Sequence, residues 1–142
     1  MTIARVIQGH GSEVWCCSPQ DGVREAVAML ARHRIGALPV VEGGRVVGIF
    51  SERDVVRNLA EHGPALLDAA VGTIMTSPVE TVEPSHDVID ALGVMTTRRF
   101  RHLPVVEGGQ MVGFVSIGDL VKYRIERIEA DAEAMRSYIQ SA

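Results

Sequence analysis

The seven residues LPVVEGG occur twice in this 142-residue chain, at residues 38–44 and again at residues 103–109. When the sequence is shifted by 65 positions, residues 14–57 align with residues 79–122 without a gap, and 17 of the 44 aligned positions are identical. A repeat of this length that is present only twice indicates a duplicated domain rather than a solenoid of short repeats. One copy of 65 residues would be marginal as a domain on its own, so we expect the two copies to pack together.

The first copy predicts the order strand, helix, strand, strand, helix. Residues 14–17 are a short strand candidate, and the apolar residues after Asp21 recur at helical spacing, with Asp21 as the expected cap. LPVVEGG predicts a strand that ends in a glycine hairpin, because paired glycines supply positive φ angles, and residues 46–50 form the returning strand. Ser51 then begins another helix. The second copy repeats this order 65 positions later, with Ser85 as the expected cap of its first helix.

The repeat boundaries follow from the break at Gly63-Pro64 and from the segment beyond the second copy. We expect a first repeat over residues 1–62, a connector over 63–72, a second repeat over 73–124 and a C-terminal helix over 125–142. Apolar residues on this helix alternate at spacings of four and three: Val121, Ile125, Ile128, Ala132, Met135 and Ile139. The stripe predicts an amphipathic helix that packs either on the body of the protein or against a second copy.

Composition and charge exclude several classes of function. The net charge is -4 and no long run of Lys or Arg is present, so nucleic acid is not an expected partner. No apolar segment approaches the roughly 20 residues that span a bilayer, and the N-terminus lacks the pattern of a signal peptide. We therefore expect a cytoplasmic protein without membrane contact. The adjacent Cys16 and Cys17 do not form a disulfide framework, and we expect one thiol to face the core.

The sequence contains none of the common motifs for catalysis or metal binding. The five histidines form no HExxH motif and do not pair with cysteine at ligand spacing, so no metal site is expected. There is no Gly-x-Ser-x-Gly elbow and no acidic pair suited to share a proton. A non-catalytic protein is therefore expected, and two classes remain open: a ligand-sensing module and an interaction scaffold.

The segments GIFSERD, residues 48–54, and GFVSIGD, residues 113–119, contain the candidate functional residues. In each, a serine precedes an aspartate by three positions, which is the arrangement of a helix capping box that contributes about 1 kcal/mol. The same arrangement directs a hydroxyl, a carboxylate and free backbone amides at one point, which suits a ribose diol and a phosphate. The pattern is compatible with either role.

LPVVEGG, the two SxxD segments and the lead-in TIMTSPVETVEPSHDVIDAL together resemble the CBS domain in its tandem form, the Bateman module. The resemblance covers residues 2–122, almost the whole chain. It implies an α/β (α+β) fold in which two βαββα repeats pack about a pseudo-twofold axis, often assembled into dimers. It also implies adenosine-derived ligands, such as AMP, ADP, ATP, NAD(H) or S-adenosylmethionine, in two clefts between the repeats.

The resemblance assigns the aspartate of each SxxD segment to the ribose hydroxyls and its serine to the ribose or phosphate. The cleft that we rank first would contain Ile35, Gly36, Arg101, His102, Phe114, Ser116 and Asp119. The second would contain Ile49, Ser51, Arg53, Asp54, Thr73, Met75, Pro78 and Phe100. Arg101 and His102 can donate to phosphate, whereas Gly36 and Ala37 at the matching positions cannot, so the two clefts are expected to be unequal.

We therefore expect a free-standing regulatory module that binds an adenine nucleotide (AMP, ADP, ATP or NAD(H)) and has no catalytic activity. Homodimerisation through helical faces is expected, and the regulated target would be an unidentified protein. The alternative is a dimerisation or protein-interaction scaffold without a physiological nucleotide. Trp15 is expected in the core or in a dimer interface rather than against a base.

Overall fold

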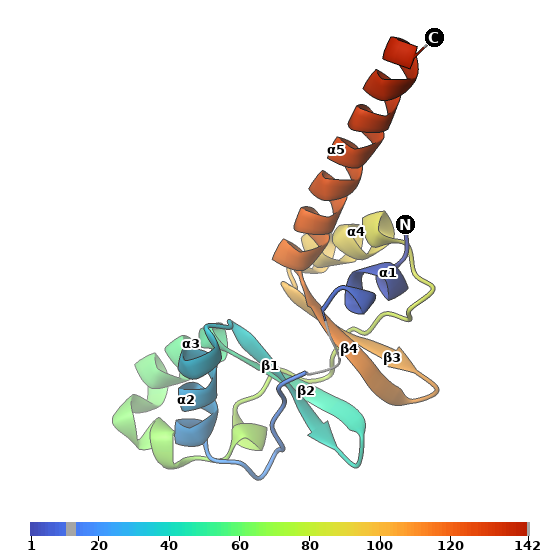
Figure 1. Ribbon diagram of the computed structural model, residues 1–142. Coiled ribbons are helices and arrows are strands. Elements are labelled where there is room, and N and C mark those ends of the chain that lie inside the picture. The colour runs from blue at the N-terminus through green and yellow to red at the C-terminus, as the bar shows by residue number, and fades with distance from the viewer. Residues whose placement is uncertain (11–13, 142) are drawn as a thin grey trace.

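The computed structural model describes residues 1–10 and 14–141, and it contains two small two-stranded sheets flanked by helices (Figure 1). The elements in chain order are α1 (Ile3–Gln8), α2 (Val23–His33), β1 (Ala37–Glu42), β2 (Arg45–Ser51), α3 (Glu52–His62), the 3-10 turns η1 (Gly63–Asp68) and η2 (Val71–Thr73), α4 (Val88–Arg98), β3 (His102–Glu107), β4 (Gln110–Ser116) and α5 (Ile117–Ser141). The order of elements confirms the tandem α+β repeat expected from the sequence.

The two hairpins have the same register, displaced by 65 residues. Val40 pairs with Gly48 in the first, and Val105 pairs with Gly113 in the second. Gly43 and Gly44 at the first turn have φ angles of 60° and 79°, as the paired-glycine pattern predicts. β2 and β4 are in contact, so the hairpins lie side by side between the helices of the first repeat and those of the second (Figure 1).

The expected first strand of each repeat exists only as one parallel bridge, which corrects the strands predicted over residues 14–17 and 79–82. In the first repeat the Cys17 amide donates to the Pro39 carbonyl, and the Cys17 carbonyl accepts from the Val41 amide. The next two bonds of a parallel ladder would need an amide hydrogen from Pro19 and from Pro39, and proline has none. Pro84 and Pro104 end the ladder of the second repeat in the same way.

The expected caps of α2 and α4 were wrong by one and two residues. Gly22 is the N-cap of α2 and Asp87 that of α4, where its carboxylate accepts from the Ile89 amide at 2.9 Å. Both N-cap residues are extended because each pairs with a segment outside its own repeat: Gly22 with Ala70, and Asp87 with Thr2. A tertiary contact therefore decides where these helices begin.

Each repeat has its own core, and each core is completed by the segment that precedes the other repeat. Ile3 and Val6 of α1 are buried with Val88, Leu103 and other residues of the second repeat. Leu66 and Val71, from the two 3-10 turns, are buried in the core of the first repeat. Figure 1 shows α1 beside α4 and the β3–β4 hairpin, on the side of the second repeat.

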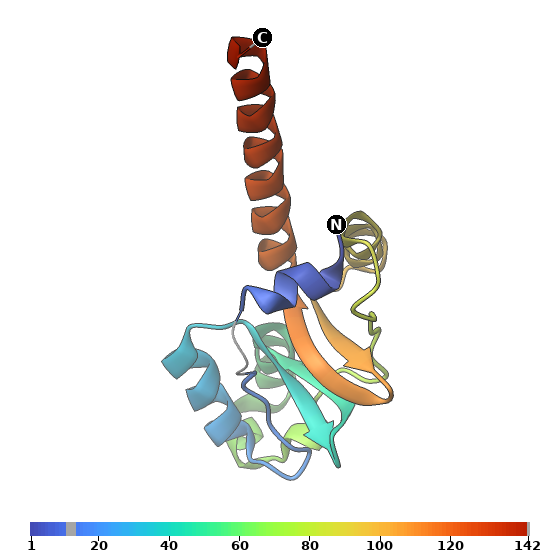
Figure 2. The ribbon, with the colours of Figure 1, turned by 45° about the vertical axis from the view of Figure 1, so that its right-hand side comes forward.

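The helix α5 begins in the second repeat and then leaves it. Leu120 is fully buried and Tyr123 packs against the same core, whereas the rest of this 25-residue helix projects beyond the body (Figures 1 and 2). The apolar stripe is exposed, from 43% at Val121 to 65% at Ile139, so the expected alternative of packing on the protein's own body is wrong. No helix in the described residues has the length and hydropathy needed to cross a membrane.

Candidate functional site

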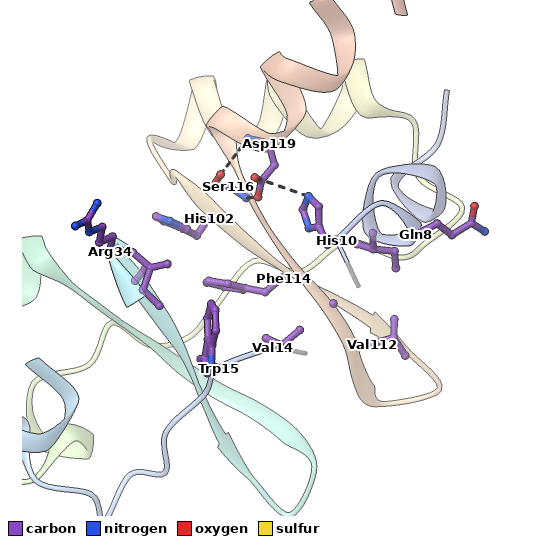
Figure 3. Close-up of a pocket in the computed structure, with 15 residues that line it drawn as sticks. Gln8, His10, Val14, Trp15, Arg34, His102, Val112, Phe114, Ser116 and Asp119 are labelled. Atoms are coloured by element: carbon purple, nitrogen blue, oxygen red, sulfur yellow. Dashed lines mark hydrogen bonds and ion pairs between the residues drawn. The ribbon is translucent and has the colours of Figure 1, made fainter. Parts of the chain in front are cut away.

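A pocket of about 660 Å³ lies where the two repeats meet (Figure 3). Its walls come from the end of α1 and the segment after it, the turn between α2 and β1, the start of β3, strand β4 and the first turn of α5. The lining residues that matter below are His10, Trp15, Arg34, Ile35, Gly36, His102, Phe114, Ser116 and Asp119. Segments far apart in the sequence therefore meet at one site.

Asp119 offers this pocket a carboxylate oxygen that is not used for capping. Its Oδ2 accepts from the Ser116 amide at 2.8 Å, and its own amide donates to Ser116 Oγ at 3.0 Å. Its Oδ1 accepts no hydrogen bond from the described residues and lies 3.8 Å from His10 Nε2, and the side chain is 37% exposed. The capping bond thus uses Oδ2 alone, and Oδ1 is left available to a ligand (Figure 3).

Asp54, the matching residue of the first repeat, is in a different state. Its Oδ2 accepts from the Ser51 amide at 2.9 Å and the Ser51 hydroxyl at 3.1 Å, and its Oδ1 accepts from the Thr76 hydroxyl at 2.8 Å. Asp54 is only 6% exposed, and Met75 lies against Gly48 beside it. Both oxygens of Asp54 are therefore satisfied within the protein, and no exposed carboxylate faces a cavity here.

Aromatic side chains supply flat apolar surfaces to the pocket. The rings of His102 and Phe114 are stacked, with centroids 5.4 Å apart. Trp15 stacks on His33 with centroids 4.0 Å apart and remains 39% exposed, so the expectation that it belongs to the core is wrong. Such surfaces suit a planar ring better than an extended polar chain.

Three basic side chains border the pocket: His10, Arg34 and His102. Burial lowers the pKa of His102 from its usual value, although nearby Asp119 acts in the opposite direction. Arg34 is the C-cap of α2 and has a left-handed backbone, with φ of 53°. These groups can donate hydrogen bonds to an anionic part of a ligand.

Six of the seven residues predicted for the first cleft line this pocket: Ile35, Gly36, His102, Phe114, Ser116 and Asp119. The seventh, Arg101, does not line it. Its side chain is exposed, and its carbonyl accepts from the Ile117 amide at 2.8 Å. Arg101 thus lies just before β3 and outside the pocket, whereas the next residue, His102, lines it.

The residues predicted for the second cleft do not line this pocket. Ser51, Asp54 and Met75 lie together beside β2 in the closed arrangement described above, and Ile49 is buried at 9%. Arg53, Thr73 and Pro78 are exposed, and Phe100 is half-buried. The structure thus brings Ser51 and Asp54 of the predicted second cleft together with the segment around Met75. Both carboxylate oxygens of Asp54 are already hydrogen-bonded within the protein.

The prediction missed the N-terminal contribution to the first cleft, including Ile7 and His10. The sequence held a weak signal: residues 2–7 and 70–75 share no identical position, but the apolar Ile3, Val6 and Ile7 align with Val71, Ile74 and Met75 at an offset of 68 rather than 65. The structure pairs these segments in the same way, since Ile7 lies against Gly113 as Met75 lies against Gly48.

No three His, Cys, Asp or Glu side chains in the described part of the chain are grouped so that they could hold a metal ion.

Comparisons with known proteins agree with the fold and the repeats. The family model of the CBS domain matches residues 10–61 and 71–126. The chain is 37% identical to the mitochondrial CBS domain-containing protein CBSX3 of Arabidopsis thaliana, over 92% of this chain and 65% of that protein. This match thus spans less than two thirds of the length of CBSX3.

Solved structures give the same result. The CBS-domain protein ATU1752 from Agrobacterium tumefaciens is 37% identical, with a TM-score of 0.83 over 87% of this chain and 99% of that one. CBSX2, solved in complex with AMP, is 24% identical, with a TM-score of 0.73 over 88% of this chain and 96% of that one. The chain, with two matched repeats and this shared architecture, belongs to the CBS domain family.

Proposed function

We propose that this chain is a regulatory module that binds an adenine nucleotide in the pocket between its repeats. The observation that carries the proposal is the free Oδ1 of Asp119, which faces a pocket of suitable size next to stacked aromatic rings. A carboxylate that accepts from both ribose hydroxyls would favour a nucleoside over a free base or a simple phosphate. The AMP complex of CBSX2, a protein of the same fold, supports this class of ligand.

The other groups of the pocket fit the remaining parts of a nucleotide. Phe114, Trp15 and Ile35 offer apolar contact to the purine ring, and His10, Arg34 and His102 can donate to the phosphate. AMP, ADP, ATP and NAD(H) all contain these parts, so we propose the class and leave the number of phosphates to the binding experiment. The same residues come from both repeats, and a bound nucleotide would therefore hold the repeats in one relative position.

We propose one nucleotide per chain rather than two. The carboxylate of Asp54 already accepts three hydrogen bonds within the protein, so a ribose in the second cleft would have to displace Thr76. The unequal clefts expected from Arg101 and His102 are retained in this proposal, but the main cause is the state of the two aspartates.

Regulation would follow from differential affinity. A ligand changes a conformational equilibrium only to the extent that it binds one state more tightly than the other. The pocket is lined by α1, the first repeat and the second repeat, so a bound nucleotide would change the position of the two repeats relative to each other. The regulated partner would be another protein that contacts only one of these arrangements.

Isothermal titration calorimetry with AMP, ADP, ATP and NADH tests the proposal. The expected result is one site per chain with a dissociation constant below about 1 mM for at least one ligand. Trp15 is the only tryptophan and lines the pocket, so its fluorescence should change with the same midpoint. A ligand at about 100 times its dissociation constant should also raise the free energy of unfolding by about 2.7 kcal/mol.

The scaffold alternative makes the opposite prediction. No heat, no fluorescence change and no change of melting temperature with any of the four ligands would overturn nucleotide binding and leave an interaction scaffold. Two sites of equal affinity would refute the proposed difference between Asp119 and Asp54, while leaving the ligand class intact.

A further inference from the structure

The exposed apolar stripe of α5 has no partner among the described residues. It consists of Val121, Ile125, Ile128, Ala132, Met135 and Ile139, and we call it the α5 seam. The spacings of four and three place these residues at the two core positions of a heptad repeat over residues 121–139. An apolar stripe of this width matches the contact surface of a two-stranded coiled coil rather than that of a helix in a globular core.

The α5 seam faces away from the protein's own body. Tyr123, which packs on the second repeat, occupies the heptad position opposite the two core positions, and buried Leu120 lies on the same side as Tyr123. Figures 1 and 2 show the helix projecting clear of the other elements beyond its first turns. A second helix can therefore reach the α5 seam beyond these first turns, whereas at the start of the seam the side chain of Arg124 donates to Met1 Sδ at 3.6 Å.

The charges beside the α5 seam favour a second copy of the same helix in parallel orientation. In a parallel pair, the residue directly before the first core position of each heptad faces the residue five places later on the other helix. Arg124 then faces Glu129 of the second copy, and Asp131 faces Arg136. Each pair has opposite charges and occurs twice by symmetry, so four attractive contacts border the seam.

An antiparallel pair that keeps all six seam residues in contact has the opposite electrostatics. There the flanking residues face residues of the same charge on the second helix: Glu129 faces Glu129, Asp131 faces Asp131, and Lys122 faces Arg136. All of these contacts are repulsive. Sliding the antiparallel helices by one heptad restores opposite charges, but it leaves two of the six seam residues of each helix without apolar contact.

The intrahelical ion pairs of α5 do not prevent this rearrangement. Asp131 lies 4.0 Å from Arg127, and Arg136 lies 2.8 Å from Glu133, with side chains that are at least 52% exposed in every case. Exposed pairs of this kind contribute little to stability, so Asp131 and Arg136 are free to pair across an interface. Burial of Leu120 fixes the first turn of α5, so the helix does not have to be nucleated on association.

From these observations we infer that α5 forms a parallel, in-register two-stranded coiled coil with α5 of a second copy of this chain. The arrangement is independent of the nucleotide pocket, because none of the seam residues lines that pocket. It brings the C-terminal ends of the two helices together.

Disulfide trapping distinguishes the parallel from the antiparallel arrangement. In a Cys16→Ser background, Ile139→Cys places one thiol at the far end of the seam, and Ser137→Cys places it on the opposite side of the same turn. In the parallel pair the two residues at position 139 lie close enough to form a disulfide. In the antiparallel pair these two residues are about 27 Å apart along the helix axis. Full-length chains are oxidised mildly, and covalent dimer is measured on a non-reducing gel.

The expected result is that Ile139→Cys forms covalent dimer at least about tenfold faster than Ser137→Cys. Equal rates for the two variants would show random collision and overturn the inference. A disulfide that forms only when Val121→Cys and Ile139→Cys chains are mixed would show the antiparallel arrangement and would also overturn it.

Seam and charge variants in the Ile139→Cys background test the same contact by a second route. Ile128→Asp should slow cross-linking to the rate of Ser137→Cys, whereas Ala130→Asp, which adds the same charge on the far side of the helix, should not. Asp131→Arg should slow cross-linking and the added Arg136→Asp should restore it, since the swap reverses both members of each pair. Cross-linking that is indifferent to Ile128→Asp, or that the double swap fails to restore, would contradict the proposed interface.

Discussion

The contrast between Asp119 and Asp54 provides the sharpest test of the nucleotide site, because the two residues occupy matching positions with opposite surroundings. Asp54→Ala removes three hydrogen bonds, from the Ser51 amide, the Ser51 hydroxyl and the Thr76 hydroxyl. At about 1 kcal/mol each, the expected loss of stability is about 3 kcal/mol. Asp119→Ala removes the single bond from the Ser116 amide, and the expected loss is about 1 kcal/mol.

The expected effects on affinity are reversed. If the free Oδ1 of Asp119 accepts from the ribose hydroxyls, its removal should weaken nucleotide binding by about 1.5–3 kcal/mol, or about 10- to 150-fold. Asp54 has no oxygen left for a ligand, so Asp54→Ala should change the affinity of the folded protein by less than about twofold. The two variants therefore separate a ligand contact from a structural cap within one chain.

Two measurements decide this prediction. Thermal unfolding without ligand gives the stability change, at about 3–5 °C per kcal/mol for a chain of this size. Calorimetry with AMP, carried out well below the lower melting temperature, gives the affinity. The reasoning is refuted if Asp54→Ala weakens binding as much as Asp119→Ala, or if Asp119→Ala lowers the melting temperature and leaves the affinity unchanged.

Two further predictions concern titratable groups. Burial lowers the pKa of His102 below its usual 6.5, so the unfolded chain binds this proton more tightly than the folded chain, and the stability that His102 contributes is lost as the pH falls below about 6.5. The melting temperature should therefore depend less on pH between 8 and about 5.5 in His102→Asn than in the unmodified protein; equal slopes would contradict this. Burial also raises the pKa of Cys17 to about 12, so a thiol reagent at about pH 8 should modify one thiol, Cys16, in the folded chain and both after unfolding. Rapid modification of both cysteines in the folded protein would show that Cys17 is not buried.

The repeat and the hairpins were predictable because their causes are local. LPVVEGG contains a strand-forming run and the paired glycines that reverse it, and both copies adopt the same register. Ser51 and Ser116 begin helices as expected, because the capping box involves residues only three positions apart. The first strand of each repeat could also have been corrected from the sequence, since Pro19 and Pro39 visibly lack the amides that its extension needs.

The long-range features could not be predicted in this way. The starts of α2 and α4 depend on pairing with Ala70 and Thr2, which belong to other parts of the chain. The exclusion of Arg101 from the pocket, and the inclusion of Trp15, depend on how the first repeat meets the second. Contacts between distant segments decide each of these.

By itself the sequence determined the duplication, the order of the elements, the family and the candidate aspartates, because these depend on residue identity and short spacing. Only the tertiary structure decided which aspartate is available. The same motif is formed by Ser51 with Asp54 and by Ser116 with Asp119. The Thr76 hydroxyl donates to Oδ1 of Asp54, whereas Oδ1 of Asp119 faces a pocket beside His10. The physical reason is that a carboxylate can serve a ligand only where no neighbour in the fold has already satisfied it.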